Sequence, residues 1–498
     1  MKNCLGRSEA EMAYNHGVRV LENPTSLAVP ILGTAGLQVA VGVSPVNLAS
    51  DPYHAANVVK LAYSFSEASA AVGFSDNLEQ YNLNQSISAT FKKFAVAPII
   101  LINVLDPKKH KADVEEKSYN VKDMQAVVDV EGMLLDKVVV KNEETELKEG
   151  TDYIAGFDSK GYVVVTLLES GSADSATKLN ISGEKIEPSL VTAEDIIGGY
   201  DAATGKESGL ELIRQIHPLF GMVPGILTSP GYSRDPAVAA VMAAKCLNIN
   251  GIFKCECIVD LDCTAAGAVK YTDIQAVKER SSFVSSHMEP VWPKVRIRDE
   301  VYYYSAIFSA LVAYIDASND DVPNLHMSNK SLPITGLCLD DKEGTEVVID
   351  KEQANVVNSF GVVTAVNING FKSWGNNTAA YPDTTDPKDR WFGCRRFFSW
   401  WGNSFILTYF KKVDDPINYR LIESVCDAEN IRGNSYAAQG KCAGARMVYV
   451  QEDNPEEDIL NGKIQFRQYL APYTPAEDIL NILEFDPSML AAALSGGE

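Results

Sequence analysis

The stretch VPGILTSPGYSRDPAVAAVMAAKCLNINGIFKCECIVDLD, residues 223–262, contains two apolar segments of strand length with a helical segment between them. Asp235 and Pro236 open the middle segment, and an aspartate at the N-cap followed by a proline in the first turn is a typical helix start. Another helical segment follows around residues 271–284. Because strands alternate with helices, this region predicts a parallel or mixed α/β core.

The same alternation begins earlier in the chain. Residues 51–98 have a helical pattern, and PIILINVLDP, residues 98–107, is an apolar run typical of a strand buried on both faces. Between residues 108 and 194, short runs such as KVVVK and YVVVTLL are separated by charged or glycine-containing turns, which predicts an all-β module. We therefore expect an inserted, surface-exposed β domain at 108–194 within a central α/β domain formed by 26–107 and 195–372.

Residues 373–486 predict a C-terminal α+β domain. Asp386 with Pro387, and then Asp415 with Pro416, are each expected to start a helix. Three strand-like runs follow: ARMVYV, GKIQFRQYLAP and ILNILEFD. We expect two long helices over a three-stranded sheet.

Near its N-terminus the sequence has the pattern of a strand, and no partner strand is evident for it. In AYNHGVRVLENPTS, residues 13–26, a short β-branched run is closed by Asn-Pro and predicts a strand near the N-terminus. This segment precedes the α/β alternation, and its partner strand is not evident from the residues themselves.

Composition excludes several classes of protein. The 498 residues, 46% hydrophobic and 22% charged, are typical of a folded protein with more than one domain. No run of 18 apolar residues could span a membrane, and the first residues lack the apolar core of a signal peptide, so we expect synthesis and retention in a cytoplasm. Nine cysteines, an odd number, argue against a secreted disulfide framework. The net charge of −22 disfavours direct binding to nucleic acid.

Two segments imitate catalytic motifs. GGYDAATGKESG, residues 198–209, resembles a phosphate-binding loop, but five residues separate its glycines where a P-loop has four, and Glu207 replaces the magnesium-binding hydroxyl residue. Asp260 and Asp262 end a predicted strand and could hold magnesium, although carboxylates at strand ends commonly form turns or caps. No H-E-x-x-H or G-x-S-x-G motif is present, so we predict no catalytic, metal-binding or cofactor-binding residue.

A family resemblance rests on motifs spread along the chain. They are YNHGVRVLENPTSLAVP, INVLDPKKH, GGYDAATGKESGLELI, VPGILTSPGYS, SNKSLPITG and, above all, WGNNTAAYPDTTDPKDRWFGCRRFFSWWGN. In this order, from about residue 13 to 487, they resemble the contractile tail sheath proteins of myophages and phage-tail-like bacteriocins.

The resemblance implies a structural protein rather than an enzyme, without cofactors. Sheath proteins of this kind form six-subunit rings stacked around a tail tube, and contraction triggered by the baseplate drives the tube through the target cell envelope. The implied partners are other copies of the chain, the tube protein, and baseplate and tail terminator proteins. The implied location is a virion tail or phage-tail-like particle assembled in the bacterial cytoplasm, with the C-terminal domain facing the tube.

The resemblance also implies arms at both termini that add strands to the C-terminal sheets of neighbouring subunits. Such addition covers the unpaired edges of a small sheet, which would otherwise promote aggregation. On this resemblance we place the N-terminal arm at residues 1–25 and the C-terminal arm at residues 487–498, and we expect the apolar side chains of the C-terminal arm to pack on a neighbour. The predicted arm residues are Gly17, Val18, Arg19, Val20, Leu21, Glu22, Met489, Leu490 and Leu494.

Two alternatives remain at this point. A type VI-like secretion sheath component shares the same physics, although such sheaths usually divide between two different chains. A cytoplasmic metal-dependent α/β enzyme built on Asp260 and Asp262 is the less favoured alternative.

Overall fold

A six-stranded sheet forms the centre of the molecule. The computed structural model describes residues 31–32 and 34–494. All neighbouring strands of the central sheet are parallel except β3 and β5, which are antiparallel. In spatial order the strands are β17 (Met288–Val291), β16 (Glu256–Asp260), β15 (Ile226–Thr228), β2 (Gln38–Gly42), β5 (Ile99–Asn103) and β3 (Val59–Ala62).

The strand, helix and strand predicted in residues 223–262 are confirmed as β15, α5 (Pro236–Leu247) and β16. The Asp235 carboxylate accepts a hydrogen bond from the backbone N–H of Ala237 and caps α5 as expected. Strand β5 is buried along its whole length, as its continuous apolar run predicts.

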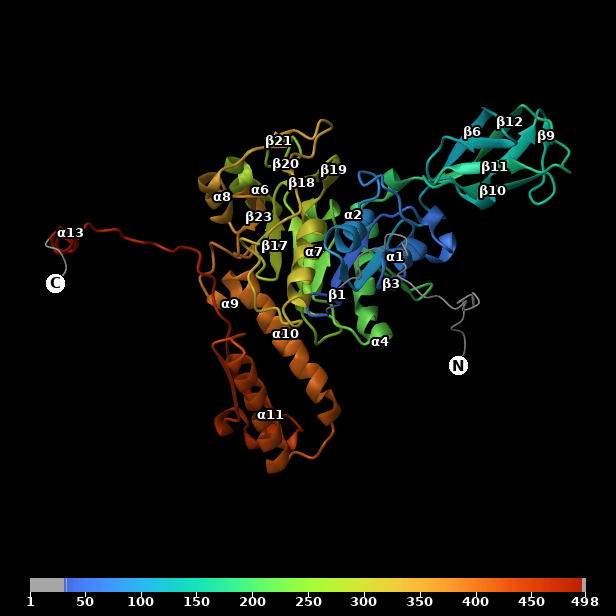
Figure 1. The fold of residues 1–498 in the computed structure, drawn as a ribbon. Helices are drawn as coiled ribbons and strands as arrows, with labels where there is room; N and C mark the ends of the chain where they lie inside the picture. Colours follow the sequence, from blue (N-terminus) through green and yellow to red (C-terminus); the bar gives the residue numbers. More distant parts are fainter. Residues whose placement is uncertain (1–30, 33, 495–498) are drawn as a thin grey trace, which may run out of the picture.

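Helices cover both faces of this sheet (Figure 1). On one face α5 packs its buried Val238 and Met242 into the same core as Leu227 of β15. On the other face lies α7 (Tyr304–Ala317), which packs with Ile226 and Ile258. Because neighbouring residues of a strand point to opposite faces, Ile226 and Leu227 serve the two cores.

Smaller elements complete the central part of the chain. Two of its sheets are the parallel pair β1·β4 and the four-stranded β19-β18-β20-β21, and the others are the hairpins β13·β14 and β22·β23. Their bounds are β1 Ile31–Leu32, β4 Val96–Ala97, β13 Gly199–Asp201, β14 Lys206–Ser208, β18 Lys294–Ile297, β19 Glu300–Tyr302, β20 Gly336–Cys338, β21 Glu346–Val347, β22 Thr364–Asn367 and β23 Phe371–Trp374. The helices are α1 Phe65–Val72, α2 Leu83–Ile87, α3 Ala193–Ile197, α4 Ile216–Phe220, α6 Ile274–Ser281 and α8 Lys351–Asn358.

Two further sheets lie between residues 111 and 186 and project to one side of the molecule (Figure 1). They enclose a hydrophobic core of their own, to which Val140, Val165 and Ile181 contribute. The four-stranded sheet has the order β6 (Lys111–Asn120), β12 (Lys178–Ile186), β8 (Val139–Asn142) and β9 (Thr145–Glu146). The three-stranded sheet has the order β10 (Tyr153–Phe157), β11 (Val163–Leu167) and β7 (Gln125–Val128).

The C-terminal part is a pair of long helices beside a small sheet, which together extend away from the central sheet (Figure 1). After α9 (Pro387–Arg390), α10 (Phe392–Tyr409) leads out from the central core. It is followed by α11 (Tyr419–Ala438), β24 (Gly444–Val448), α12 (Glu456–Leu460) and β25 (Arg467–Ala471).

The predicted three-stranded C-terminal sheet is wrong. Only β24 and β25 pair, antiparallel, and the run ILNILEFD, residues 479–486, pairs with no strand of the described chain. Prolines at 472 and 475 interrupt the chain after β25, and the segment then runs outward to α13 (Pro487–Leu494), far from the body of the subunit (Figure 1).

The predicted start of the second long helix is also wrong. Helix α11 begins at Tyr419, and the Asn418 side chain caps it by accepting from the N–H of Leu421 at 3.0 Å. Asp415 instead forms an ion pair with Lys412, 3.3 Å apart. A cap needs an extended residue directly before the first helical turn, and Asn418 has that conformation.

Candidate functional site

The C-terminal segment exposes an unusual amount of apolar surface. Leu483 is 87% exposed and Ile479 is 84% exposed. Monomeric proteins rarely leave a contiguous series of large apolar side chains in water. The other exposed members of this series are Leu480, Ile482, Phe485, Met489, Leu490 and Leu494. From here on we call residues 479–494 the C-terminal arm, which begins before the arm predicted at 487–498 and includes the run ILNILEFD.

The predicted arm residues Met489, Leu490 and Leu494 all lie on α13 and are exposed. The Asp486 carboxylate accepts from the backbone N–H of Ser488 at 2.8 Å, so an aspartate and a proline start this helix as they start α5. That these side chains pack on a neighbour stays a prediction. The other predicted arm residues, Gly17 to Glu22, lie outside the described residues.

At one edge of the small sheet, a side chain of α11 bonds the backbone of Met447, and the other edge has no partner in the described chain. On α11, the Asn430 carboxamide bonds both backbone polar groups of Met447, accepting from its N–H at 2.8 Å and donating to its carbonyl at 3.1 Å. A carboxamide placed in this way substitutes for a neighbouring strand along β24. In the described part of the chain, β25 pairs only with β24, so its second edge is open to another strand.

Aromatic side chains hold this sheet against the helices. Trp401 of α10 is buried, and its ring contacts Tyr436 of α11 with centroids 5.6 Å apart. The Arg432 guanidinium lies 4.0 Å from the centre of the Trp401 ring. Leu470 of β25 packs against the same cluster, so the open edge has a rigid support.

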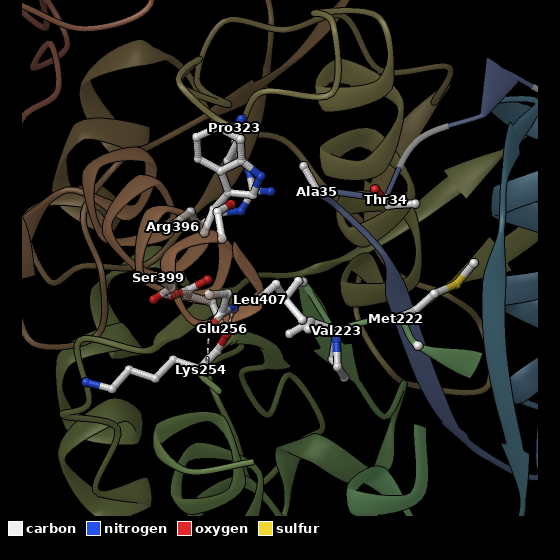
Figure 2. A pocket seen from close by; sticks show the side chains of 16 residues that line it. Thr34, Ala35, Met222, Val223, Lys254, Glu256, Pro323, Arg396, Ser399 and Leu407 are labelled. Carbon is white, nitrogen blue, oxygen red and sulfur yellow. Dashed lines mark hydrogen bonds between the residues drawn. The ribbon is translucent and has the colours of Figure 1, made fainter. Parts of the chain in front are cut away.

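Helix α10 is joined to the central domain by polar contacts, of which those of Arg396 and Ser399 are buried. Arg396 forms an ion pair with Asp316 of α7, and both side chains are buried. One turn further, the Ser399 hydroxyl donates to the Glu256 carboxylate at 2.6 Å, as Figure 2 shows. The Asn403 carboxamide then bonds both backbone polar groups of Lys254, at 2.6 and 3.0 Å.

A cavity of about 250 Å³ lies at this joint, between α10 and the loop that precedes β15 (Figure 2). Its apolar wall includes Met222, Val223 and Leu407, and its polar wall includes Glu256 and Arg396. Glu256 accepts from Ser399, and Arg396 is paired with Asp316.

The segment just before the C-terminal arm is fixed to the body of the subunit. The Tyr473 carbonyl accepts from Nε2 of His326 at 2.9 Å. Glu477 accepts from the Asn376 side chain at 3.1 Å and lies 3.6 Å from the Arg390 guanidinium. We call residues 473–477 the C-terminal root. Sequence reasoning missed these contacts, and the two prolines at 472 and 475 are the signal that could have marked a change of path.

Asp260, considered above as a magnesium ligand, accepts hydrogen bonds from backbone and side-chain groups of the fold. The buried Asp260 carboxylate accepts from the N–H of Gly231 at 3.0 Å, and from the N–H and hydroxyl of Ser305 at 3.0 and 2.7 Å. Asp262 instead accepts from the N–H of Thr264 at 3.0 Å, within its own turn. Burial raises the pKa of Asp260. The described residues hold no group of three or more potential metal ligands.

The segment that resembles a phosphate loop is a β-hairpin. Its strands β13 and β14 pair from Gly199 with Ser208 to Asp201 with Lys206. The Thr204 hydroxyl donates to the Asp201 carboxylate at 2.6 Å and closes the turn.

Among the helices in the described ranges, none is long and apolar enough to cross a membrane.

Solved structures share this fold over almost the whole chain. A subunit of the PVC sheath complex, an extracellular contractile injection system in its contracted state, matches with a TM-score of 0.57 and 14% identity. That match covers 96% of this chain and all of the other. A chain of the anti-feeding prophage baseplate matches with a TM-score of 0.55 and 14% identity, and it covers 95% of this chain and all of the other. The fold is therefore that of contractile sheath proteins.

Sequence relatives have the same character, although no family model matches the chain. The tail sheath protein of Burkholderia phage BcepMu is 24% identical over 495 residues, which cover 97% of this chain and 99% of the relative. The tail sheath protein of Escherichia phage P2 is 24% identical over 64% of this chain and 76% of the relative. The resemblance to contractile tail sheath proteins is thus confirmed, and these relatives are structural sheath proteins rather than enzymes, which is the class predicted for this chain.

Proposed function

We propose that this chain is the repeating subunit of a contractile tail sheath. It polymerises as six-subunit rings stacked around a tail tube, and contraction drives the tube through the envelope of a target cell. The observation that carries this proposal is the C-terminal arm, whose apolar side chains find no burial within the described subunit. A monomeric protein gains no stability from an exposed apolar segment of this kind, whereas a polymer can bury the segment between subunits.

The arm joins subunits by strand addition. Residues 479–485 lie along the open edge of β25 in another copy, where main-chain hydrogen bonds give affinity and alternate side chains set the register. Each net hydrogen bond contributes roughly 0.5–1.5 kcal/mol, and burying one leucine or isoleucine side chain contributes roughly 1.5–3 kcal/mol more. A strand of this length therefore provides a contact of several kcal/mol, which is repeated throughout the lattice.

Helix α13 is the second part of the same contact. Its apolar side chains Met489, Leu490 and Leu494 pack on the copy that accepts the strand, as a helix rather than as a further strand. An equivalent N-terminal arm, Gly17 to Glu22, adds a strand to a different copy. Each subunit is then linked to more than one neighbour.

The remaining parts take different positions in the particle. Residues 26–107 and 195–372 form the central domain, and the inserted domain, 108–194, faces outward. Residues 373–486 face the tail tube. The projection of the β module and of the α10–α11 pair in different directions supports this assignment (Figure 1). The further partners are tube, baseplate and tail terminator proteins, and the particle is a phage tail or a phage-tail-like injection device assembled in the bacterial cytoplasm.

Contraction needs no nucleotide in this scheme. The polar contacts of Arg396, Ser399 and Asn403 tie the C-terminal part to the central domain, which favours movement of each subunit as one body. The arms stay connected while subunits rotate and slide, and the contracted lattice gains the larger contact area.

Electron microscopy of a truncated chain tests the proposal. The full chain should form rings or tubes, while deletion of residues 479–498 should leave folded subunits that no longer polymerise. Deletion of residues 495–498 alone is the matched control and should polymerise. Normal polymers from the chain that lacks 479–498 would contradict the role of the arm.

A further inference from the structure

One loop contacts both the residues that follow the N-terminal segment and the residues that precede the C-terminal arm. It follows α7, comprises residues 319–326, and is called the junction loop here. Its Asp321 carboxylate accepts from the backbone N–H groups of Thr34 and Ala35 at 2.8 and 2.7 Å, and from the Thr34 hydroxyl at 2.6 Å. Strand β1, which pairs with β4, and then Thr34 and Ala35 follow the segment in which the N-terminal arm is predicted, and we call Thr34 and Ala35 the N-terminal root.

The other end of the junction loop holds the C-terminal root. Because the Tyr473 carbonyl can only accept, Nε2 of His326 must carry a proton. Its Nδ1 is buried without a hydrogen-bond partner against α10, where a Cβ on Gly393 would lie only 2.6 Å away. Burial lowers the pKa of His326, so the ring is neutral with its proton on the nitrogen that binds the root.

The middle of the junction loop is held by the C-terminal part of the chain. Val322 is buried in the same cluster as Phe397 and Trp401 of α10. The Asn319 side-chain carbonyl accepts from the ammonium group of Lys441 at 2.7 Å. A displacement of the C-terminal helices would therefore also displace the junction loop.

The backbone of the junction loop is strained between its two contacts. Asp320 and Asp321 both have positive φ angles, 58° and 57°, in the left-handed region that few residues other than glycine adopt readily. Two successive residues in this region are kept there by surrounding contacts. These include the three hydrogen bonds of the Asp321 carboxylate, the hydrogen bond from the Asp321 N–H to the Asp316 carbonyl at 2.9 Å, and the ion pair of Asp320 with Lys441 at 3.2 Å.

We propose that the junction loop couples the two arms. Asp321 is the positioning residue of the N-terminal root and His326 that of the C-terminal root, and release of one root loosens the other. Only five positions separate the two residues, so a relaxed backbone at Asp321 shifts the ring of His326. A pull on one arm then reaches the other through this loop without deforming the central sheet. That the terminal segments act as arms rests on the proposed function, but the coupling between the two roots is a property of the single subunit.

The first test uses Asp321→Gly in full-length subunits kept too dilute to polymerise. Glycine adopts a φ of 57° without strain, so this change removes the carboxylate and keeps the backbone shape accessible. Two sites are followed by peptide-resolved mass spectrometry. One is amide hydrogen exchange at Thr34 and Ala35, and the other is alkylation of the Cys394 thiol, which is buried beneath the C-terminal root with its Sγ 3.6 Å from the Tyr473 carbonyl.

Coupling predicts that both sites respond to Asp321→Gly. Exchange at Thr34 and Ala35 should rise because their acceptor is gone, and alkylation of Cys394 should become roughly tenfold faster because the far root has loosened. Faster exchange with unchanged Cys394 alkylation would overturn the coupling. Unchanged exchange would show that Asp321 does not hold the N-terminal root.

The reciprocal test changes His326. His326→Ala should accelerate exchange at Thr34 and Ala35, while His326→Gln should preserve the wild-type rates, because the glutamine amide can still donate to the Tyr473 carbonyl. The matched control is Asp320→Gly, which has the same left-handed backbone and an exposed carboxylate that touches neither root. Equal acceleration by Asp320→Gly and Asp321→Gly would also overturn the assignment.

This inference can fail separately from the proposed function. If deletion of residues 479–498 leaves polymerisation intact, the proposed role of the arm is wrong, while the coupling is still decided by the rates in single subunits. If that deletion blocks polymerisation and Cys394 alkylation does not respond to Asp321→Gly, only the coupling is wrong.

Discussion

The Arg396 guanidinium and the Asp316 carboxylate form an ion pair sealed between α10 and α7, with side-chain exposures of 2% and 0%. It lies where the C-terminal helix leaves the central domain. A buried ion pair adds little net stability, but loss of one partner leaves an unpaired charge in the interior. The pair therefore fixes how α10 docks on the sheet.

Removal of one partner should be much more costly than removal of both. Arg396→Met should lower the free energy of unfolding by about 3–5 kcal/mol, because it leaves the Asp316 carboxylate buried without its partner. The double variant Arg396→Met, Asp316→Leu should recover most of this loss. Urea denaturation of the wild type and the two variants measures these losses, and equal losses in the single and double variants would contradict the argument.

Glycine at 433 should be required for docking of the small sheet. A Cβ at Gly433 on α11 would lie 2.5 Å from the carbonyl oxygen of Ala445 in β24. Gly433→Ala should therefore push the sheet away, lower stability by about 1–3 kcal/mol and impair polymerisation.

Gly402→Ala is the matched control, because Gly402 of α10 has open space around its Cβ position. This change should be neutral or raise stability by up to about 1 kcal/mol, since alanine favours a helix more than glycine does. Thermal unfolding and electron microscopy of both variants decide the matter. Equal behaviour of the two would contradict the packing argument.

Stability should depend on pH through Glu289. Its carboxylate is fully buried, neither oxygen has a hydrogen-bond partner, and burial raises its pKa well above the usual 4.5. The folded chain therefore holds a proton that the unfolded chain releases, so this contribution is complete below pH 4.5 and is lost as the pH rises toward the folded pKa.

Glu289→Gln should remove this dependence. The stability of the variant relative to the wild type should increase with pH above 4.5, with a slope of at most about 1.4 kcal/mol per pH unit. Urea denaturation between pH 5 and pH 8 measures the difference. A constant difference over this range would show that the carboxyl group does not titrate there.

Asp260 should behave as a structural residue rather than as a metal ligand. Asp260→Ala removes the acceptor of the Gly231 and Ser305 hydrogen bonds and should destabilise the fold by about 2–4 kcal/mol. Asp262→Ala should have a much smaller effect on folding. Stoichiometric divalent metal in the purified protein, lost in either variant, would instead favour the enzyme alternative.

The sequence predicts the parts of this fold whose signals are local. The cap at Asp235 and the apolar run in β5 are correct because both depend on neighbouring residues. The third C-terminal strand was mispredicted because a strand pattern does not say which chain supplies its partner. Residues 479–485 have the pattern of a strand, but prolines 472 and 475 direct the chain away from the sheet.

The roots could not be predicted because their contacts join distant parts of the chain. Asp321 and Thr34 are 287 positions apart, and no local pattern links them. His326 and Tyr473 are 147 positions apart, and their contact involves a backbone carbonyl, which leaves no trace in residue types.

The central claim is that the C-terminal arm of one copy pairs with β25 of another. Cryo-electron microscopy of the assembled polymer tests it most directly. The account predicts that residues 479–485 form a strand hydrogen-bonded to the open edge of β25 in a neighbouring subunit, with α13 packed on that same subunit. A polymer in which residues 479–485 fold back on their own subunit, or touch no other copy, would contradict it.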